Sequence, residues 1–154
     1  MSDQTKSNHD PAQVFAFFNE IGIINQLSRE MFEARLPDGM IVQHFSVLNH
    51  LMRLGDGKTP LSIARAFQTP KPSMTNTLSG LEKRGLVEMR PNPDDGRSKQ
   101  VWLTDAGRHF RNQAIQDLGA DISRLSDKLD FELIARLTPH LAEIRQILDE
   151  NRDP

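Results

Sequence analysis

The chain of 154 residues has the length of one ordinary domain, since a single core usually spans about 100–200 residues. Its hydrophobic fraction of 37% and charged fraction of 26% are typical of globular proteins, and no stretch has the ~18–20 apolar residues of a membrane span. The absence of cysteine excludes disulfides, thiolate catalysis and cysteine metal sites. The polar N-terminus does not have the pattern of a secretory signal, so a cytoplasmic protein is expected.

Positive charge is concentrated in the middle of the chain. The net charge is −2, yet residues 53–111 hold eleven Lys or Arg and six Asp or Glu, which leaves +5 there and −7 elsewhere. A basic segment between acidic ends favours a face for a polyanion. Charge alone leaves open the alternative of a chance fluctuation on a solvated surface.

Four helices are expected in the first half of the chain, because apolar residues recur there at helical spacing. Asp10-Pro11 and Thr59-Pro60 are helix starts, and Gly85 is a helix-ending glycine. The expected ranges are about residues 11–35, 40–54, 61–67 and 72–84.

The fourth of these helices has two different faces. Met74, Leu78 and Leu81 form an apolar stripe that should face inward. The polar residues between them should face outward, and these are Ser73, Thr75, Asn76 and Ser79.

After Gly85 the apolar period changes from that of a helix to that of a strand. Residues 86–90 and 100–103 alternate apolar and polar side chains, and the loop between them is rich in Pro, Asp and Gly, so a β-hairpin is expected. Thr104 should then start a long helix with an apolar stripe from Phe110 to Leu129. Asp130 should start a final helix that contains Pro139.

This order of elements predicts a winged helix-turn-helix, a fold in which the fourth helix enters the major groove of DNA. Short polar side chains can read base edges there, and Asn makes a bidentate contact to adenine. We therefore predict base contacts by the outward residues Ser73, Thr75, Asn76 and Ser79. In the hairpin loop Arg97 is predicted to enter a minor groove, with Asp95 orienting it. Phosphate contacts are predicted for Lys71, Lys83, Arg84, Arg90 and Lys99.

Three runs of sequence resemble one known family. They are LSGLEKRGLVE at residues 78–88, RPNPDDGRSK at 90–99 and VWLTDAG at 101–107. Together they are similar to the multiple-antibiotic-resistance regulator (MarR) family. The resemblance implies a homodimeric transcription factor, usually a repressor, with a ligand cleft between its dimerisation and DNA-binding regions. It also implies a recognition helix at about Lys71–Arg84 and a wing arginine at Arg97, with Asp95 as its partner.

The expected architecture is mainly α with a small β-hairpin wing. Residues 38–103 should form the winged helix-turn-helix, and residues 1–37 and 104–154 a helical dimerisation region continuous with it. Phe15, Phe18 and Phe45 could line an apolar cleft for a small aromatic or amphipathic ligand. Plain core and dimer packing is the alternative for these rings.

The predicted function is sequence-specific binding of double-stranded DNA by a homodimeric repressor on a palindromic operator. Release from the operator by a small ligand is a further expectation. No enzyme is expected, because the sequence has no nucleophile and base pair, phosphate-binding glycine loop or paired carboxylates at reactive spacing. No cofactor or metal is expected, with a site at His44 or His109 as the alternative. A winged-helix module that binds small molecules or proteins without specific DNA binding also remains open.

Overall fold

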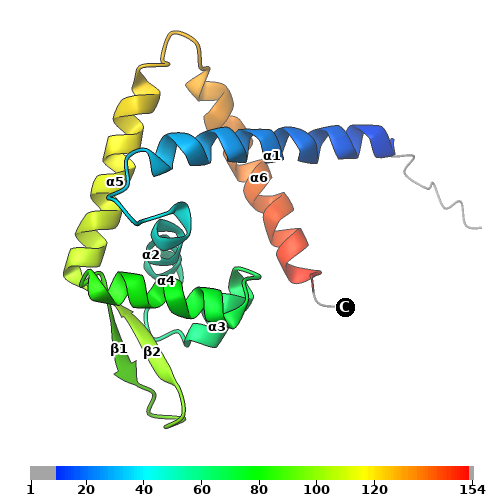
Figure 1. The fold of residues 1–154 in the computed structure, drawn as a ribbon. Coiled ribbons are helices and arrows are strands. Elements are labelled where there is room, and N and C mark those ends of the chain that lie inside the picture. The colour runs from blue at the N-terminus through cyan, green and yellow to red at the C-terminus, as the bar shows by residue number, and fades with distance from the viewer. Residues whose placement is uncertain (1–9, 153–154) are drawn as a thin grey trace, which may run out of the picture. The chain divides into compact units, whose positions relative to one another are not determined.

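The computed structural model describes residues 10–152 as helices joined by short loops, with one two-stranded sheet (Figure 1). The elements in chain order are α1 (Pro11–Glu33), α2 (Val42–Leu54), α3 (Pro60–Ala66), α4 (Lys71–Lys83), β1 (Val87–Pro91), β2 (Lys99–Leu103), α5 (Asp105–Ser123) and α6 (Phe131–Glu150). The chain divides into two compact units, one ending at Leu118 and one beginning at Gly119. This mainly helical winged fold confirms the predicted fold class.

Short polar side chains start the helices where the sequence predicted. Asp10 accepts the Ala12 N–H at 2.9 Å, Thr59 accepts the Ser62 N–H at 3.2 Å, and Asp130 accepts the Leu133 N–H at 2.9 Å. The Thr104 hydroxyl oxygen accepts the Gly107 N–H at 3.0 Å. These bonds satisfy backbone donors that have no partner within their own helix.

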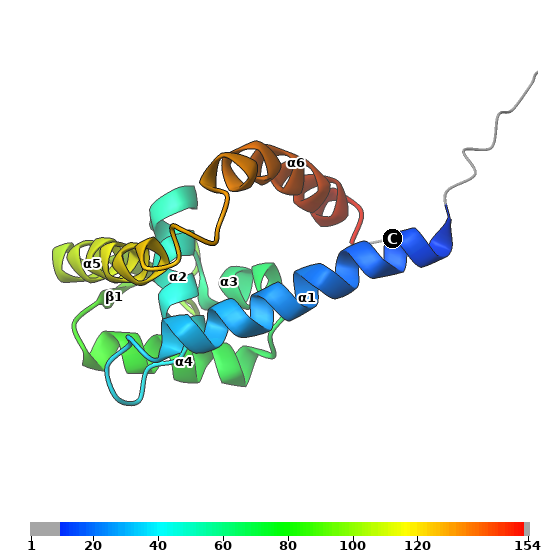
Figure 2. The ribbon, with the colours of Figure 1, turned by 90° about the horizontal axis from the view of Figure 1, so that it is seen from above.

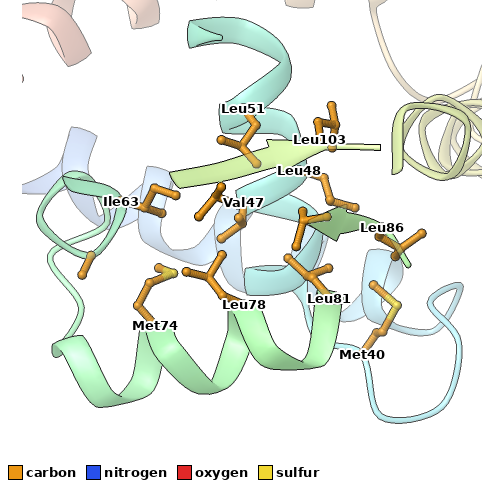
Figure 3. Packing of buried hydrophobic residues seen from close by; sticks show 13 residues of the cluster. Met40, Val47, Leu48, Leu51, Ile63, Met74, Leu78, Leu81, Leu86 and Leu103 are labelled. Atoms are coloured by element: carbon orange, nitrogen blue, oxygen red, sulfur yellow. The ribbon is translucent and has the colours of Figure 1, made fainter. Parts of the chain in front are cut away.

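The core of the first unit lies between α2, α3, α4 and the hairpin. Met74, Leu78 and Leu81 of α4 are fully buried, as are Val47 and Leu48 of α2. Figure 3 shows the three α4 side chains pointing toward α2 and the sheet, with Ile63 of α3 beside them. Burial of the apolar stripe confirms which face of the fourth helix is inward.

Helix α2 runs crosswise to α4, so each helix touches the other over a limited stretch (Figure 2). The hairpin pairs β1 with β2 in an antiparallel register that sets Val87 opposite Leu103 and Met89 opposite Val101. A further bridge joins Val101 to Lys58, which lies just before α3, with a 2.8 Å bond from the Val101 N–H to the Lys58 carbonyl. The base of the wing is therefore tied through β2 to the loop that precedes α3.

Two expected helix boundaries are wrong. The second helix begins at Val42, because Met40 lies in a turn in which its N–H donates to the Pro37 carbonyl at 3.0 Å. The long helix ends at Ser123 and does not continue to Leu129. Beyond it the Leu125 N–H donates to the Ile122 carbonyl at 2.8 Å, a tighter spacing than an α-helix has. Ser123, Ser126 and Asp127 favour such turns because their side chains compete for backbone groups.

Helices α1 and α6 leave most of their apolar residues exposed. Phe32 is the one buried residue of α1, and α6 has none within its described length. Exposed apolar residues include Phe15 at 71%, Ile24 at 61% and Ile147 at 53%. Among residues 10–152, no helix is both long and apolar enough to cross a bilayer. The predicted division into a DNA-binding and a dimerisation region stays a prediction, and its residues 1–9 and 153–154 lie outside the described part.

Gly107 is predicted to be essential for packing the first turn of α5 against the hairpin. A Cβ at Gly107 would lie 2.0 Å from the Leu86 carbonyl oxygen and 2.9 Å from Leu103 Cδ1. We expect Gly107→Ala to lower the free energy of unfolding by about 1–3 kcal/mol, because backbone must move to admit the methyl group. Denaturant titration measures the change. Gly119→Ala is the control, since a Cβ there has no neighbour within 4 Å, and alanine should stabilise the helix by up to about 1 kcal/mol. Equal effects of the two substitutions would contradict this account.

Candidate nucleic-acid interface

The outer face of α4 carries the predicted base-reading residues. Ser73, Thr75 and Asn76 are exposed and Ser79 is half-buried. The side chain of Asn76 makes no hydrogen bond to any other described residue, so both ends of its amide are available to a ligand. Whether these four side chains read bases stays a prediction.

Two threonine hydroxyls of α4 are bonded within the helix. Thr75 donates to the Lys71 carbonyl at 2.9 Å, and the buried Thr77 donates to the Ser73 carbonyl at 3.1 Å. Thr75 therefore presents its methyl group and the lone pairs of its oxygen, while its hydroxyl proton is already used. A methyl group at this position suits contact with the methyl group of thymine.

The wing loop is shaped by its own hydrogen bonds. Asn92 accepts the Asp94 N–H at 3.0 Å and donates to the Ser98 hydroxyl at 2.8 Å. Asp95 accepts the backbone N–H of Arg97 at 2.9 Å. The exposed Arg97 guanidinium makes no ion pair within the described chain, so Asp95 positions the backbone of Arg97 and leaves its charged end free for another partner.

The five predicted phosphate contacts divide into two groups. Lys71, Lys83 and Lys99 are exposed and form no ion pair with other described residues. Arg84, by contrast, donates from Nη2 to the Asp38 carbonyl at 2.5 Å and so holds the turn between α1 and α2. The sequence did not reveal this contact, because Asp38 and Arg84 are 46 residues apart.

Arg90 is also engaged within the protein. Its guanidinium pairs with the Glu88 carboxylate and lies 4.2 Å from the centre of the Trp102 ring. Such a stack is a cation–π interaction. The hairpin register sets Glu88 opposite Trp102 and makes Arg90 its diagonal neighbour, so this contact could have been anticipated once the register was known. The Trp102 ring therefore packs on the hairpin and does not offer an open surface on which a base could stack.

Sequence reasoning missed the anchor that fixes the wing. Asp56, in the loop after α2, accepts the Leu103 N–H at 2.7 Å through Oδ1 and pairs with Arg108 at 2.8 Å through Oδ2. One carboxylate thus joins β2 to the first turns of α5. Nearby, Arg111 donates from Nε and Nη2 to the Asn49 side chain at 3.1 and 2.8 Å, which ties α5 to α2.

No three His, Asp or Glu side chains gather as metal ligands within residues 10–152. Of the two histidines considered for a metal, His44 uses Nδ1 to accept the Ile41 N–H at 3.0 Å. Burial, reinforced by the charge of Arg84, lowers the pKa of His44 from its usual value, so the ring is neutral at pH 7.

The three phenylalanines of the predicted ligand cleft do not meet in one chain. Phe45 packs edge-on against Phe32 near the end of α1, with ring centres 4.4 Å apart. Phe15 and Phe18 lie near the start of α1, and Phe18 precedes Phe32 by 14 residues, or roughly 21 Å along the helix at about 1.5 Å per residue. A cleft lined by all three would need a second chain.

Comparison with known proteins agrees with this geometry. The model of the MarR family matches residues 38–98, the stretch from the α1–α2 turn to the wing. Over these residues the chain is similar to the MarR family. This match and a relative solved with operator DNA support a winged-helix, DNA-binding transcriptional regulator.

Solved structures of MarR proteins share the fold over most of the chain. Wild-type apo MarR from E. coli is 26% identical, with a TM-score of 0.69 over 82% of this chain and 93% of that one. A mutant MarR from E. coli complexed with operator DNA is 25% identical, with a TM-score of 0.65 over 88% and 99% of the two chains. BldR from Sulfolobus solfataricus, at 21% identity and a TM-score of 0.68 over 88% and 99%, has the same fold.

Removing the Asp56 carboxylate is predicted to loosen the wing. In Asp56→Ala the Leu103 N–H and the Arg108 guanidinium both lose their partner, and we expect the free energy of unfolding to fall by about 1–3 kcal/mol. Hydrogen exchange of the Leu103 amide should speed up as well. Glu88→Ala serves as the control, because its pair with Arg90 is about half exposed on both sides and should contribute no more than about 1 kcal/mol. An unchanged exchange rate at Leu103 would refute the anchoring role.

Proposed function

We propose that this protein is a homodimeric repressor that binds a palindromic DNA operator through α4 and the wing. In this proposal Ser73, Thr75, Asn76 and Ser79 contact base edges in the major groove. Arg97 enters an adjacent minor groove, where a narrow A·T-rich segment attracts a guanidinium. The exposed lysines, with Arg84 and Arg90, contribute charge toward the phosphates.

The observation that carries this proposal is the division of α4 into two faces. Its inner stripe is fully buried, while Ser73, Thr75 and Asn76 are exposed and lack apolar neighbours on the same face. A helix held rigidly by its apolar side can present polar side chains to a groove at fixed positions. A protein-docking helix would need exposed apolar anchors instead, and the exposed residues of α4 include no large apolar side chain.

The case for a homodimer rests on the apolar surfaces of α1 and α6. On α6 alone, Leu133, Leu137, Leu141, Ile147 and Leu148 are 42–53% exposed. Apolar surface of this extent favours burial against a partner, and a second copy related by a two-fold axis would bury both sets together. The two recognition helices would then read half-sites about 34–36 Å apart, or a multiple of that distance.

Repression and release by a ligand extend the same proposal. A solved structure that is 26% identical to this chain is described as the multiple antibiotic resistance repressor MarR, and we carry that role over to this chain. The ligand would be a small aromatic or amphipathic molecule, with the exposed Phe15 and Phe18 of one helix facing apolar surface of the second chain. The chain has no cysteine, so its release would not use a thiol.

Two substitutions are predicted to separate specificity from affinity. Asn76→Ala should weaken binding to the preferred operator by about 1–3 kcal/mol and leave binding to non-specific DNA unchanged, because base contacts carry the sequence information. Lys99→Ala should weaken both kinds of binding alike and reduce the slope of log K against log salt by about 1. Titration of both DNAs at several salt concentrations measures these effects, with the operator taken from random DNA selected by the protein. Matching profiles for the two variants would refute the assignment of the α4 face.

The dimer is predicted to depend on α6. The wild-type chain should have twice the monomer mass of 17.5 kDa in dilute solution. Leu141→Glu should shift it toward the monomer, because a carboxylate would have to be buried in the interface. Leu61→Glu on α3 is a matched control, since Leu61 and Leu141 are both 42% exposed. Mass measurement over a range of concentrations decides it, and a wild-type monomer or a stable Leu141→Glu dimer would contradict the proposal.

A further inference from the structure

The imidazole of His44, in the first turn of α2, fills a gap on the surface of α4. A Cβ at Gly80 of α4 would lie 3.0 Å from His44 Nε2 and 3.6 Å from His44 Cδ2. The ring therefore occupies the space into which a side chain at position 80 would extend. Glycine inside a helix costs about 1 kcal/mol relative to alanine, and at Gly80 it provides the room for the histidine.

The tautomer of His44 is fixed by the start of α2. Nδ1 accepts the Ile41 N–H at 3.0 Å, so in the neutral ring the proton sits on Nε2, which is then a hydrogen-bond donor. Nε2 has no acceptor among the described residues. It is also absent from the buried unpaired side-chain nitrogens of this part of the chain, Gln43 Nε2 and Trp102 Nε1, so it remains open to solvent.

The Nε2–H group of His44 lies beside the face of α4 that carries Ser73 and Asn76, the proposed base-reading residues. Gly80 follows Asn76 by one turn, and Ser73, Asn76, Gly80 and Lys83 succeed one another at steps of three, four and three residues. Residues at these spacings share one helix face. Arg84 lies close enough for its charge to act on His44. Glu33, an acid close to the start of α2, accepts the Val42 N–H at 3.0 Å and pairs with Arg29 at 3.2 Å.

We propose that His44 Nε2–H donates a hydrogen bond to one DNA phosphate that lies over Gly80, and so helps to fix the position of α4 in the groove. The proposal rests on the proposed function. Because Gly80 has no side chain, the imidazole can lie directly against α4, which places Nε2 where a phosphate over Gly80 can accept its proton. Phosphate contacts of this kind set the register of a protein on the duplex and carry no sequence information themselves.

The test compares His44→Asn with His44→Gln. Asparagine keeps an acceptor near the position of Nδ1 for the Ile41 N–H but does not reach the position of Nε2. Glutamine reaches that position with an N–H donor but gives up the bond to Ile41. We expect His44→Asn to unfold at the wild-type temperature and to bind the operator about three- to tenfold more weakly, the effect of one lost neutral hydrogen bond. His44→Gln should be less stable and keep more of the affinity.

The phosphate itself is located with operators that carry a single uncharged methylphosphonate at each position in turn. One position per half-site should weaken wild-type binding and leave His44→Asn unaffected. Gly80→Ala is a second variant, which improves helix propensity and leaves His44 in the sequence. Its methyl group would lie 3.0 Å from Nε2 and so displace the ring, and this variant should therefore also lose sensitivity at the same phosphate.

Identical methylphosphonate profiles for wild type and His44→Asn, or equal operator affinity of the two, would overturn the inference and leave the proposed function intact. A wild-type protein that binds the selected operator no better than random DNA would overturn both.

Discussion

The orientation of every outward-facing side chain on α4 depends on one packing constraint, the complete burial of Met74, Leu78 and Leu81. These side chains lie against Val47 and Leu48 of α2 and against the hairpin, which fixes the rotation of α4 about its own axis. A rotation by one residue, about 100°, would bury polar groups and expose leucine, at a cost of several kcal/mol. Burial of the apolar face of α4 therefore fixes the direction in which its polar face points.

The wing is fixed by polar contacts at its base, since its tip is too small to form a core of its own. Asp56 joins Leu103 to Arg108, and the bridge from Lys58 to Val101 adds a backbone bond to the same strand. Arg90 and Trp102 then stack across the hairpin. The charged ends of Arg97 and Lys99 remain unengaged within the described residues, and this supports the proposal that they contact DNA.

The helix α2 links both parts of the site, because one of its faces packs on α4 and its flanking residues reach the wing and α5. Its first turn holds His44 against Gly80, its middle residue Asn49 accepts from Arg111, and the loop after it supplies Asp56. A shift of the first turns of α5 would therefore displace Arg108, and with it Asp56 and the β2 strand that Asp56 holds.

The sequence by itself determined the order of elements, the inward stripe of α4 and the similarity to the MarR family, because helix period, strand alternation, capping residues and short motifs are local signals. It was wrong at the end of α5, where short polar residues turn the chain after Ser123 although the apolar stripe continues. The tertiary structure alone decided that Arg84 and Arg90 bind within the protein, that Asp56 anchors the wing and that His44 meets Gly80. These contacts join residues brought together by packing or by strand register, and residue spacing along the chain does not encode which side chains will meet.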